Sequence, residues 1–324
     1  MGHTELIGML HVPINTLIAA PAQWRSSLGL PALTHQDWKF LAELPAPPID
    51  KAADWRCAGL ALDSVTNLSF WQPLLQRLLS EAECYRRNGV RTVIIENVAA
   101  PYFVRSSQPP IIYWCMRGLA EVLKASFPTF RIGIQVLAHG DDWAMDIACR
   151  SKLDFLRCES ALFEGLRPEG RTPNEGNLAK LYMMRNQLMA QLGLAEPAPQ
   201  VYLDLRKKHT AFMPGLVSLE PWLQNILFQK IEGVVVTGPS TGAPVTEADL
   251  REARIAIEKV KSQTAAAVGT PWAPPLIVGS GVSPDNSAMC NRYADAIIVG
   301  SALKRVATGN APLTRGTCDA SWTR

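Results

Sequence analysis

Several features that would narrow the class of protein are missing from this chain of 324 residues. Its seven cysteines are odd in number and include no CxxC pair, which indicates reduced thiols in an intracellular protein. Runs of basic residues are no longer than short pairs and triplets, under a formal net charge of +3, so no stripe suited to nucleic acid is present. No apolar stretch is long and clean enough to span a bilayer. We therefore expect a cytoplasmic protein with no nucleic-acid partner and no membrane insertion; a mitochondrial location, without a visible transit peptide, is the alternative.

What the sequence does contain is a repeated succession of short, β-branched apolar runs, each followed by an amphipathic stretch of helical length. The eight runs are residues 6–12, 92–97, 131–137, 154–159, 200–206, 233–238, 276–281 and 295–301. The predicted helices are 71–88, 113–126, 141–150, 175–193, 218–231, 246–263 and 284–292. This order predicts an α/β protein in which residues 1–324 form one (β/α)8 TIM barrel, with an open doubly wound sheet as the alternative.

Residues 13–70 interrupt this rhythm after the first run. They carry clusters of proline and glycine together with Trp24, Trp38 and Trp55. Long loops inside compact domains are uncommon and are usually functional or poorly ordered. We interpret the segment as a surface insertion that is either a partly ordered loop or a lid over the barrel mouth.

The last two runs end in a repeated VGS unit, at positions where barrels often bind phosphate. Glycines let a phosphate approach backbone N–H groups, and serines add hydroxyl donors. The predicted phosphate-binding residues are Gly279, Ser280, Gly281, Gly300 and Ser301. The alternative is that these glycines only form tight turns.

The stretch DLRKKH, residues 204–209, gathers a carboxylate, two ammonium groups and an imidazole. If Leu203 and Leu205 pack against helices, strand alternation turns Asp204 to the barrel interior. There Asp204 could act as a general base beside Lys208, while His209 shuttles a proton. A solvated charged turn is the alternative for the whole stretch.

Three further kinds of residue complete the candidate site. Glu96 is a fourth catalytic candidate, although a glutamate at a strand end often only pairs with a cation. Hydroxyl and amide groups at the same barrel rim predict contacts with a hydroxylated substrate, and these residues are Asn97, Thr237, Ser240 and Thr241. No HxH, HxxxH or paired-cysteine spacing is present, so we predict neither a metal site nor a cofactor.

The segments IGMLHVP, GVRTVIIEN, LDFLRCES, VYLDLRKKH, GVVVTGPSTGAP, GSGVSPDN and ADAIIVGSALK, in this order, resemble the BtpA/SgcQ family. The resemblance implies a ribulose-phosphate-binding-type barrel and, by position, functional roles for the Glu96-Asn97 pair, the Asp204 block and the glycine-rich strand ends. One departure is ENVAAPYF, where Ala99 and Ala100 stand in place of the family's usual acidic residue. If that acid is catalytic in relatives, the activity of this chain is altered.

Two functions of different class follow from the resemblance. The first is an isomerase, lyase or hydrolase acting on a small phosphorylated or hydroxylated ligand, such as a phosphosugar or nucleoside. The second is a non-catalytic assembly or stability factor of the kind associated with photosystem I biogenesis. A homo-oligomer is compatible with a barrel of this size in either case.

Overall fold

A computed structural model of the chain describes residues 4–20, 28–49, 57–98, 107–159, 166–167, 170–171, 178–206, 229–238, 243–268 and 272–300. Eight parallel strands close into a barrel in the order β1-β10-β9-β8-β7-β4-β3-β2. They are β1 (Glu5–Val12), β2 (Thr92–Asn97), β3 (Arg131–Gln135), β4 (Phe155–Cys158), β7 (Gln200–Arg206), β8 (Gly233–Val236), β9 (Leu276–Val278) and β10 (Ala296–Val299). Each corresponds to one of the eight apolar runs, so the predicted (β/α)8 barrel is confirmed and the open sheet is excluded. A two-residue pair, β5 (Leu166–Arg167) and β6 (Gly170–Arg171), lies outside the barrel sheet.

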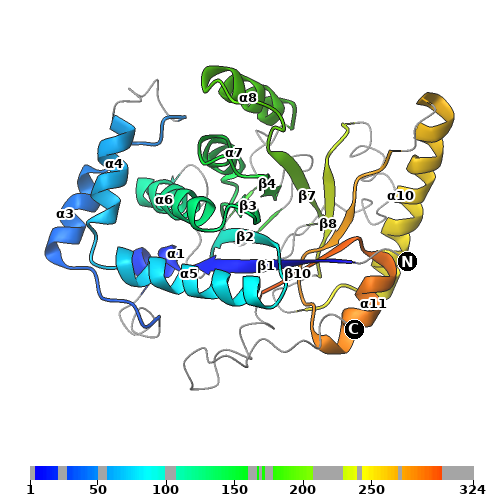
Figure 1. Cartoon of the computed structure of the whole chain (residues 1–324), viewed down its shortest axis with the longest axis horizontal. Coiled ribbons are helices and arrows are strands. Elements are labelled where there is room, and N and C mark those ends of the chain that lie inside the picture. Colours follow the sequence, from blue (N-terminus) through cyan, green and yellow to red (C-terminus); the bar gives the residue numbers. More distant parts are fainter. Residues whose placement is uncertain are drawn as a thin grey trace.

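Helices surround these strands (Figure 1). Those that follow the barrel rhythm are α5 (Trp71–Arg87), α6 (Pro110–Ser126), α7 (Asp141–Arg150), α8 (Leu178–Gln191), α10 (Glu247–Val268) and α11 (Pro284–Tyr293). Six of the predicted helices are thereby confirmed, although α6 begins three residues early because Pro110 is tolerated in the first turn. The predicted helix at 218–231 lies almost wholly outside the described residues.

Local signals explain where several helices begin and end. Thr246 Oγ1 accepts a hydrogen bond from the Asp249 backbone N–H at 3.1 Å and thereby caps the first turn of α10. Ser283 and Asn286 form a reciprocal capping box ahead of Pro284 in α11. Gly89 and Gly193 adopt positive φ values of 82° and 60° at the ends of α5 and α8.

Residues 13–70 contain helices that their loop-like composition did not predict. These are α1 (Ile14–Ala19), α3 (His35–Glu43) and α4 (Cys57–Thr66). Figure 1 shows α3 and α4 as an outer layer beside α5 and α6, and α4 contacts both. The structure therefore adds helices to this insertion, and tertiary contacts such as those of α4 with α5 and α6 support them. A role as a lid stays a prediction.

Asp37 links α3 to Ser69, which lies between α4 and α5, and so stabilises this outer layer. Its buried carboxylate accepts hydrogen bonds from the Ser69 backbone N–H at 2.9 Å and the Ser69 hydroxyl at 2.7 Å. At the N-cap of α3 it accepts from the backbone N–H of Thr34 at 2.6 Å. Burial raises the pKa of Asp37, but the hydrogen bonds from Ser69 and Thr34 outweigh it and hold the pKa below its ordinary value of 3.8.

This arrangement predicts a pH-dependent contribution to stability. Because the folded-state pKa is depressed, the stabilisation is complete above the ordinary value of 3.8 and is lost as pH falls through the lower folded value. Asp37→Ala is expected to lower the free energy of unfolding by about 2 kcal/mol at pH 7. The difference from wild type should shrink in urea titrations towards pH 3, whereas Asp63→Ala, at an exposed carboxylate of α4, should show no such difference at pH 7. A constant difference across the whole pH range would contradict the assignment.

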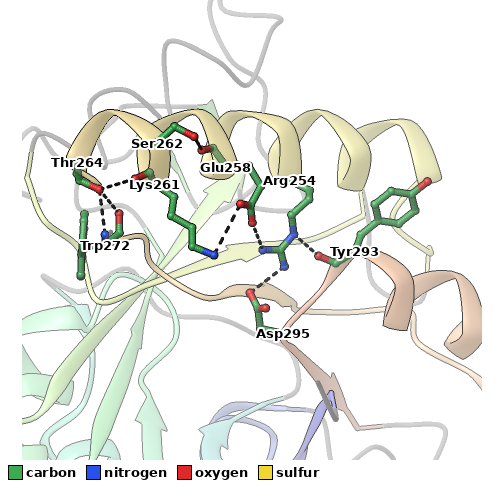
Figure 2. A network of polar contacts seen from close by, with 8 residues as sticks. All are labelled: Arg254, Glu258, Lys261, Ser262, Thr264, Trp272, Tyr293 and Asp295. Atoms are coloured by element: carbon green, nitrogen blue, oxygen red, sulfur yellow. Dashed lines mark hydrogen bonds and ion pairs between the residues drawn. The ribbon is translucent and has the colours of Figure 1, made fainter. Parts of the chain in front are cut away.

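A second polar network joins α10 to the starts of β9 and β10 (Figure 2). The Arg254 guanidinium donates to the Tyr293 carbonyl at 2.6 Å and to the Asp295 carboxylate at 2.8 Å. The same Asp295 oxygen accepts from the Leu276 backbone N–H at 2.8 Å. Since Leu276 and Ala296 begin their strands, this network secures the end of the barrel opposite its carboxyl-terminal mouth.

Within the described part of the chain, no helix is both long and apolar enough to cross a membrane.

Candidate functional site at the barrel mouth

The barrel interior changes character from one layer of side chains to the next. Its middle is apolar and is filled by Ile7, Met9, Ile94, Phe155, Tyr202, Val235, Ile277, Ala296 and Ile298. Because side chains alternate along a strand, the residues two positions beyond the last of these on each strand, and two beyond Gly133 on β3, also point inward, nearer the carboxyl-terminal ends. They are His11, Glu96, Gln135, Arg157, Asp204, Thr237, Gly279 and Gly300. A polar layer therefore closes the apolar interior at the end where barrel enzymes carry their active sites.

An ion pair between Arg157 and Asp204 lies at the centre of this polar layer. Arg157 Nε donates to Asp204 Oδ1 at 2.8 Å, and Nη2 donates to Oδ2 at 3.1 Å. Both side chains are only 2% exposed. Burial lowers the pKa of Arg157, but the charge and hydrogen bonds of Asp204 outweigh it and the net pKa is raised, so the guanidinium stays charged.

Asp204 therefore does face the interior, as strand alternation predicts, with Leu203 and Leu205 packed in the outer core. Its cationic neighbour in the described residues is Arg157, 47 positions earlier in the chain. A carboxylate bonded through both oxygens to a guanidinium is well placed to fix that guanidinium and poorly placed to abstract a proton. The prediction that Asp204 acts as a general base stays a prediction, with an alternative role in holding Arg157.

Glu96 lies beside His11 on the neighbouring strand. The two residues are in register on β1 and β2, and His11 Nε2 is 3.5 Å from Glu96 Oε2. The His11 side chain is 22% exposed and that of Glu96 9%. An imidazole beside a carboxylate can exchange protons near neutral pH, so this pair offers acid–base chemistry at the mouth.

Asn97 is fully buried and organises the turn after β3. Its side-chain N–H donates to the Leu137 carbonyl at 2.7 Å, and its amide oxygen accepts from the Leu137 backbone N–H at 2.6 Å. It also donates to Asn15 Oδ1 at 3.1 Å. This geometry supports a positioning role, and direct contact of Asn97 with a substrate stays a prediction.

The glycines of the predicted phosphate site have reasons to be glycine that require no ligand. A Cβ on Gly279 would lie 2.4 Å from Val235 and 2.9 Å from the Arg157 guanidinium. Gly281 has a φ of +70°, and a Cβ there would lie 2.5 Å from the Ala243 carbonyl oxygen. The Ser280 hydroxyl accepts a hydrogen bond from the Gly238 backbone N–H at 3.3 Å. The loops after β8 and β9 therefore pack closely against each other, and phosphate binding there stays a prediction.

Thr237 and Gly300 occupy the same inward layer, and Thr237 is buried. The other predicted site residues, Lys208, His209, Ser240, Thr241 and Ser301, lie outside the described residues, as do Ala99 and Ala100.

Three residues of the polar layer, His11, Gln135 and Arg157, are not among the predicted site residues. The available signal was an arginine, a histidine and a glutamine two positions after an inward residue in otherwise apolar strands. Burial raises the pKa of Cys115 to about 12 and of Cys149 to about 11, which disfavours the reactive thiolate form of both. The described residues also contain no group of three or more His, Cys, Asp or Glu side chains that could hold a metal.

A parallel (β/α)8 barrel with charged side chains buried at its carboxyl-terminal mouth has the architecture of the TIM-barrel proteins. Residues 69–313 match the BtpA family model, and the chain belongs to the BtpA family.

Among curated relatives, an uncharacterised mitochondrial protein of Caenorhabditis elegans is 28% identical over 236 residues, covering 71% of this chain and 76% of the relative. The photosystem I biogenesis protein BtpA of Synechocystis sp. is 25% identical over 233 residues, which is 72% of each chain. Among solved structures, KGPDC from Streptococcus mutans aligns with a TM-score of 0.47 at 12% identity, over 77% of this chain and 89% of that one.

Proposed function

We propose that the chain is an enzyme that binds a small phosphorylated, polyhydroxylated molecule in the barrel mouth and moves a proton on it. The observation that carries this proposal is the polar inner layer above the apolar interior. A barrel filled only for stability needs apolar side chains there, as the layer of Phe155 and Tyr202 illustrates. Burial of Arg157, Asp204 and Glu96 instead costs desolvation energy. Such a cost is expected where charged side chains serve catalysis or ligand recognition.

The proposed roles follow from position. His11 and Glu96 form the acid–base pair, with their donor and acceptor atoms 3.5 Å apart. Arg157, held in place by Asp204, supplies positive charge where negative charge develops on the substrate. The ends of β9 and β10 receive the phosphate, through backbone N–H groups near Ser280, Gly281 and Gly300. An isomerase, lyase or hydrolase reaction fits these groups.

A thermal-shift panel tests this proposal directly. Wild-type protein is heated with sugar phosphates, nucleoside monophosphates, the unphosphorylated parent compounds and inorganic phosphate, against sodium chloride at equal ionic strength. A ligand at about 100 times its dissociation constant contributes about 2.7 kcal/mol and should raise Tm by about 5 °C. Stabilisation by phosphorylated compounds above their parents supports the proposal. An unchanged Tm across the panel would count against it.

A second function is favoured by one relative, the photosystem I biogenesis protein BtpA of Synechocystis sp.. An assembly factor would act through a surface, and the outer layer of α3 and α4, with Trp38 45% exposed, is a candidate. It predicts a silent ligand panel and loss of partner association when residues 25–65 are deleted. Homo-oligomerisation and a cytoplasmic location stay predictions under either function.

A further inference from the structure

We propose that Gln135 selects the ligand of this mouth by accepting a hydrogen bond from a ligand hydroxyl or N–H group. The inference rests on the proposed function, because it concerns the same site, and it adds which part of the ligand lies where. Gln135 is the last residue of β3 and pairs in register with Glu96 on β2.

The direction of the Gln135 side chain follows from the alternation of β3. Ile132 and Ile134 pack in the outer core against the helices. Gly133 faces the interior, since a Cβ there would meet the Phe155 ring. Gln135 is two residues further and therefore points to the interior as well, in the polar layer between Glu96 on β2 and Arg157 on β4.

The oxygen of the Gln135 carboxamide is buried without the hydrogen-bond donor that such an acceptor requires. The residue is 2% exposed, and its Oε1 atom has no hydrogen-bond partner among the described residues. Asn97, at the end of the neighbouring strand, shows the usual condition, because both atoms of its amide are bonded. A buried acceptor that forms no hydrogen bond is unfavourable. A glutamine that served only for packing could be replaced by an apolar side chain of equal length.

The surrounding groups indicate the class of donor. Glu96 contributes a carboxylate beside Gln135, and the nearby guanidinium of Arg157 is occupied by Asp204. The Glu96 carboxylate and the unpartnered Oε1 of Gln135 lie on this side of the mouth, which suits hydroxyl or N–H groups of a ligand better than a phosphate. In the strand order, β3 stands four places from β9, diametrically across the barrel. The geometry thus places the polyol end of the ligand at β2 and β3, and its phosphate at β9 and β10.

The test compares wild type with Gln135→Met, which keeps the length of the side chain and removes the acceptor. Thermal shifts are measured with pentose and hexose phosphates, with their deoxy analogues, with the unphosphorylated sugars and with inorganic phosphate. Arg254→Ala, which disrupts the network at the opposite end of the barrel, is the control for a loss of stability remote from the mouth.

We expect the ligand-free Tm of Gln135→Met to equal or exceed that of wild type, because an unsatisfied buried acceptor is removed. Its affinity for the stabilising sugar phosphate should fall about tenfold, while its shift with inorganic phosphate is retained. Wild type should discriminate between that sugar phosphate and one of its deoxy analogues, and Gln135→Met should not. Arg254→Ala should have a lower Tm and an unchanged ligand-induced shift.

The outcomes separate this inference from the function on which it rests. If sugar phosphates stabilise wild type and Gln135→Met equally, the role of Gln135 is overturned and the proposed function stands. A fall in the ligand-free Tm of Gln135→Met with equal ligand shifts overturns it as well, in favour of a structural role. If only unphosphorylated sugars stabilise wild type, and Gln135→Met loses that effect, Gln135 keeps its role and the phosphate assignment fails. Silence of the whole panel overturns both.

Discussion

Replacing Asp204 with alanine is expected to lower the free energy of unfolding by about 4 kcal/mol, measured by urea denaturation. The physical reason is the state in which Arg157 is left. Its guanidinium is 2% exposed and donates two hydrogen bonds to Asp204, at 2.8 and 3.1 Å. In the described residues its remaining hydrogen bond is to the Gly279 carbonyl at 3.4 Å, and the charges of Glu96 and Glu159 also act on it. Without the Asp204 carboxylate, the buried positive charge loses its principal partner, and its desolvation is offset only in part.

The control is the double variant Arg157→Met/Asp204→Leu. Replacing both members of a buried ion pair with apolar groups of similar size is often neutral, so this variant should recover most of the lost stability. It should nevertheless lose turnover of the ligand identified by the thermal-shift panel, because the proposed function assigns Arg157 to negative charge that develops on the substrate during the reaction. Full turnover in a stable double variant would remove Arg157 from the reaction. An Asp204→Ala variant within about 1 kcal/mol of wild type would show that the pair contributes little.

The pair of Arg157 and Asp204 shows which parts of the site can be predicted from a single sequence. Strand alternation around Leu203 and Leu205 correctly turned Asp204 inward, because both leucines lie in the outer core. The partner could not be predicted from local spacing, since it comes from β4. The sequence suggested the adjacent lysines, Lys207 and Lys208, because nearness along the chain is all that a motif records. Which strands meet, and in which register, is decided by closure of the barrel.

Contacts between distant residues also explain two other differences between the sequence prediction and the structure, one in residues 13–70 and one at the VGS units. Residues 13–70 carry prolines in loop-like clusters, and their helices depend on contacts such as that of Asp37 with Ser69, 32 positions away. The VGS units suggested phosphate binding, but the structure adds a packing reason for two of the glycines, in the approach of Arg157 to Gly279 and of Ala243 to Gly281. Eight buried strands, by contrast, are visible as eight apolar runs, because burial on both faces leaves its mark on each run separately.

Substitution of Gly133 is expected to have the second large effect on stability. The absence of a side chain at this position of β3 leaves space for the aromatic layer of the barrel. A Cβ atom there would lie 2.3 Å from the nearest carbon of the Phe155 ring, far inside van der Waals contact. The ring cannot easily retreat, since it stacks on Tyr202 with centroids 4.7 Å apart and lies 4.7 Å from the Arg131 guanidinium. Gly133→Val is therefore expected to lower the free energy of unfolding by about 3 kcal/mol, with a matching fall in the urea midpoint.

A compensating change tests that cause. Phe155→Leu removes ring atoms from the space that the new side chain needs, so Gly133→Val/Phe155→Leu should be more stable than the sum of the single effects predicts, by at least about 1 kcal/mol. Strand propensity acts in the opposite direction, because valine is favoured over glycine in a strand. A stabilising Gly133→Val substitution would thus show that propensity outweighs the clash. If the effects of the two substitutions on the free energy of unfolding were simply additive, the ring of Phe155 would not be the group that Gly133 accommodates. The layer below the candidate site would then tolerate a larger side chain without rearranging.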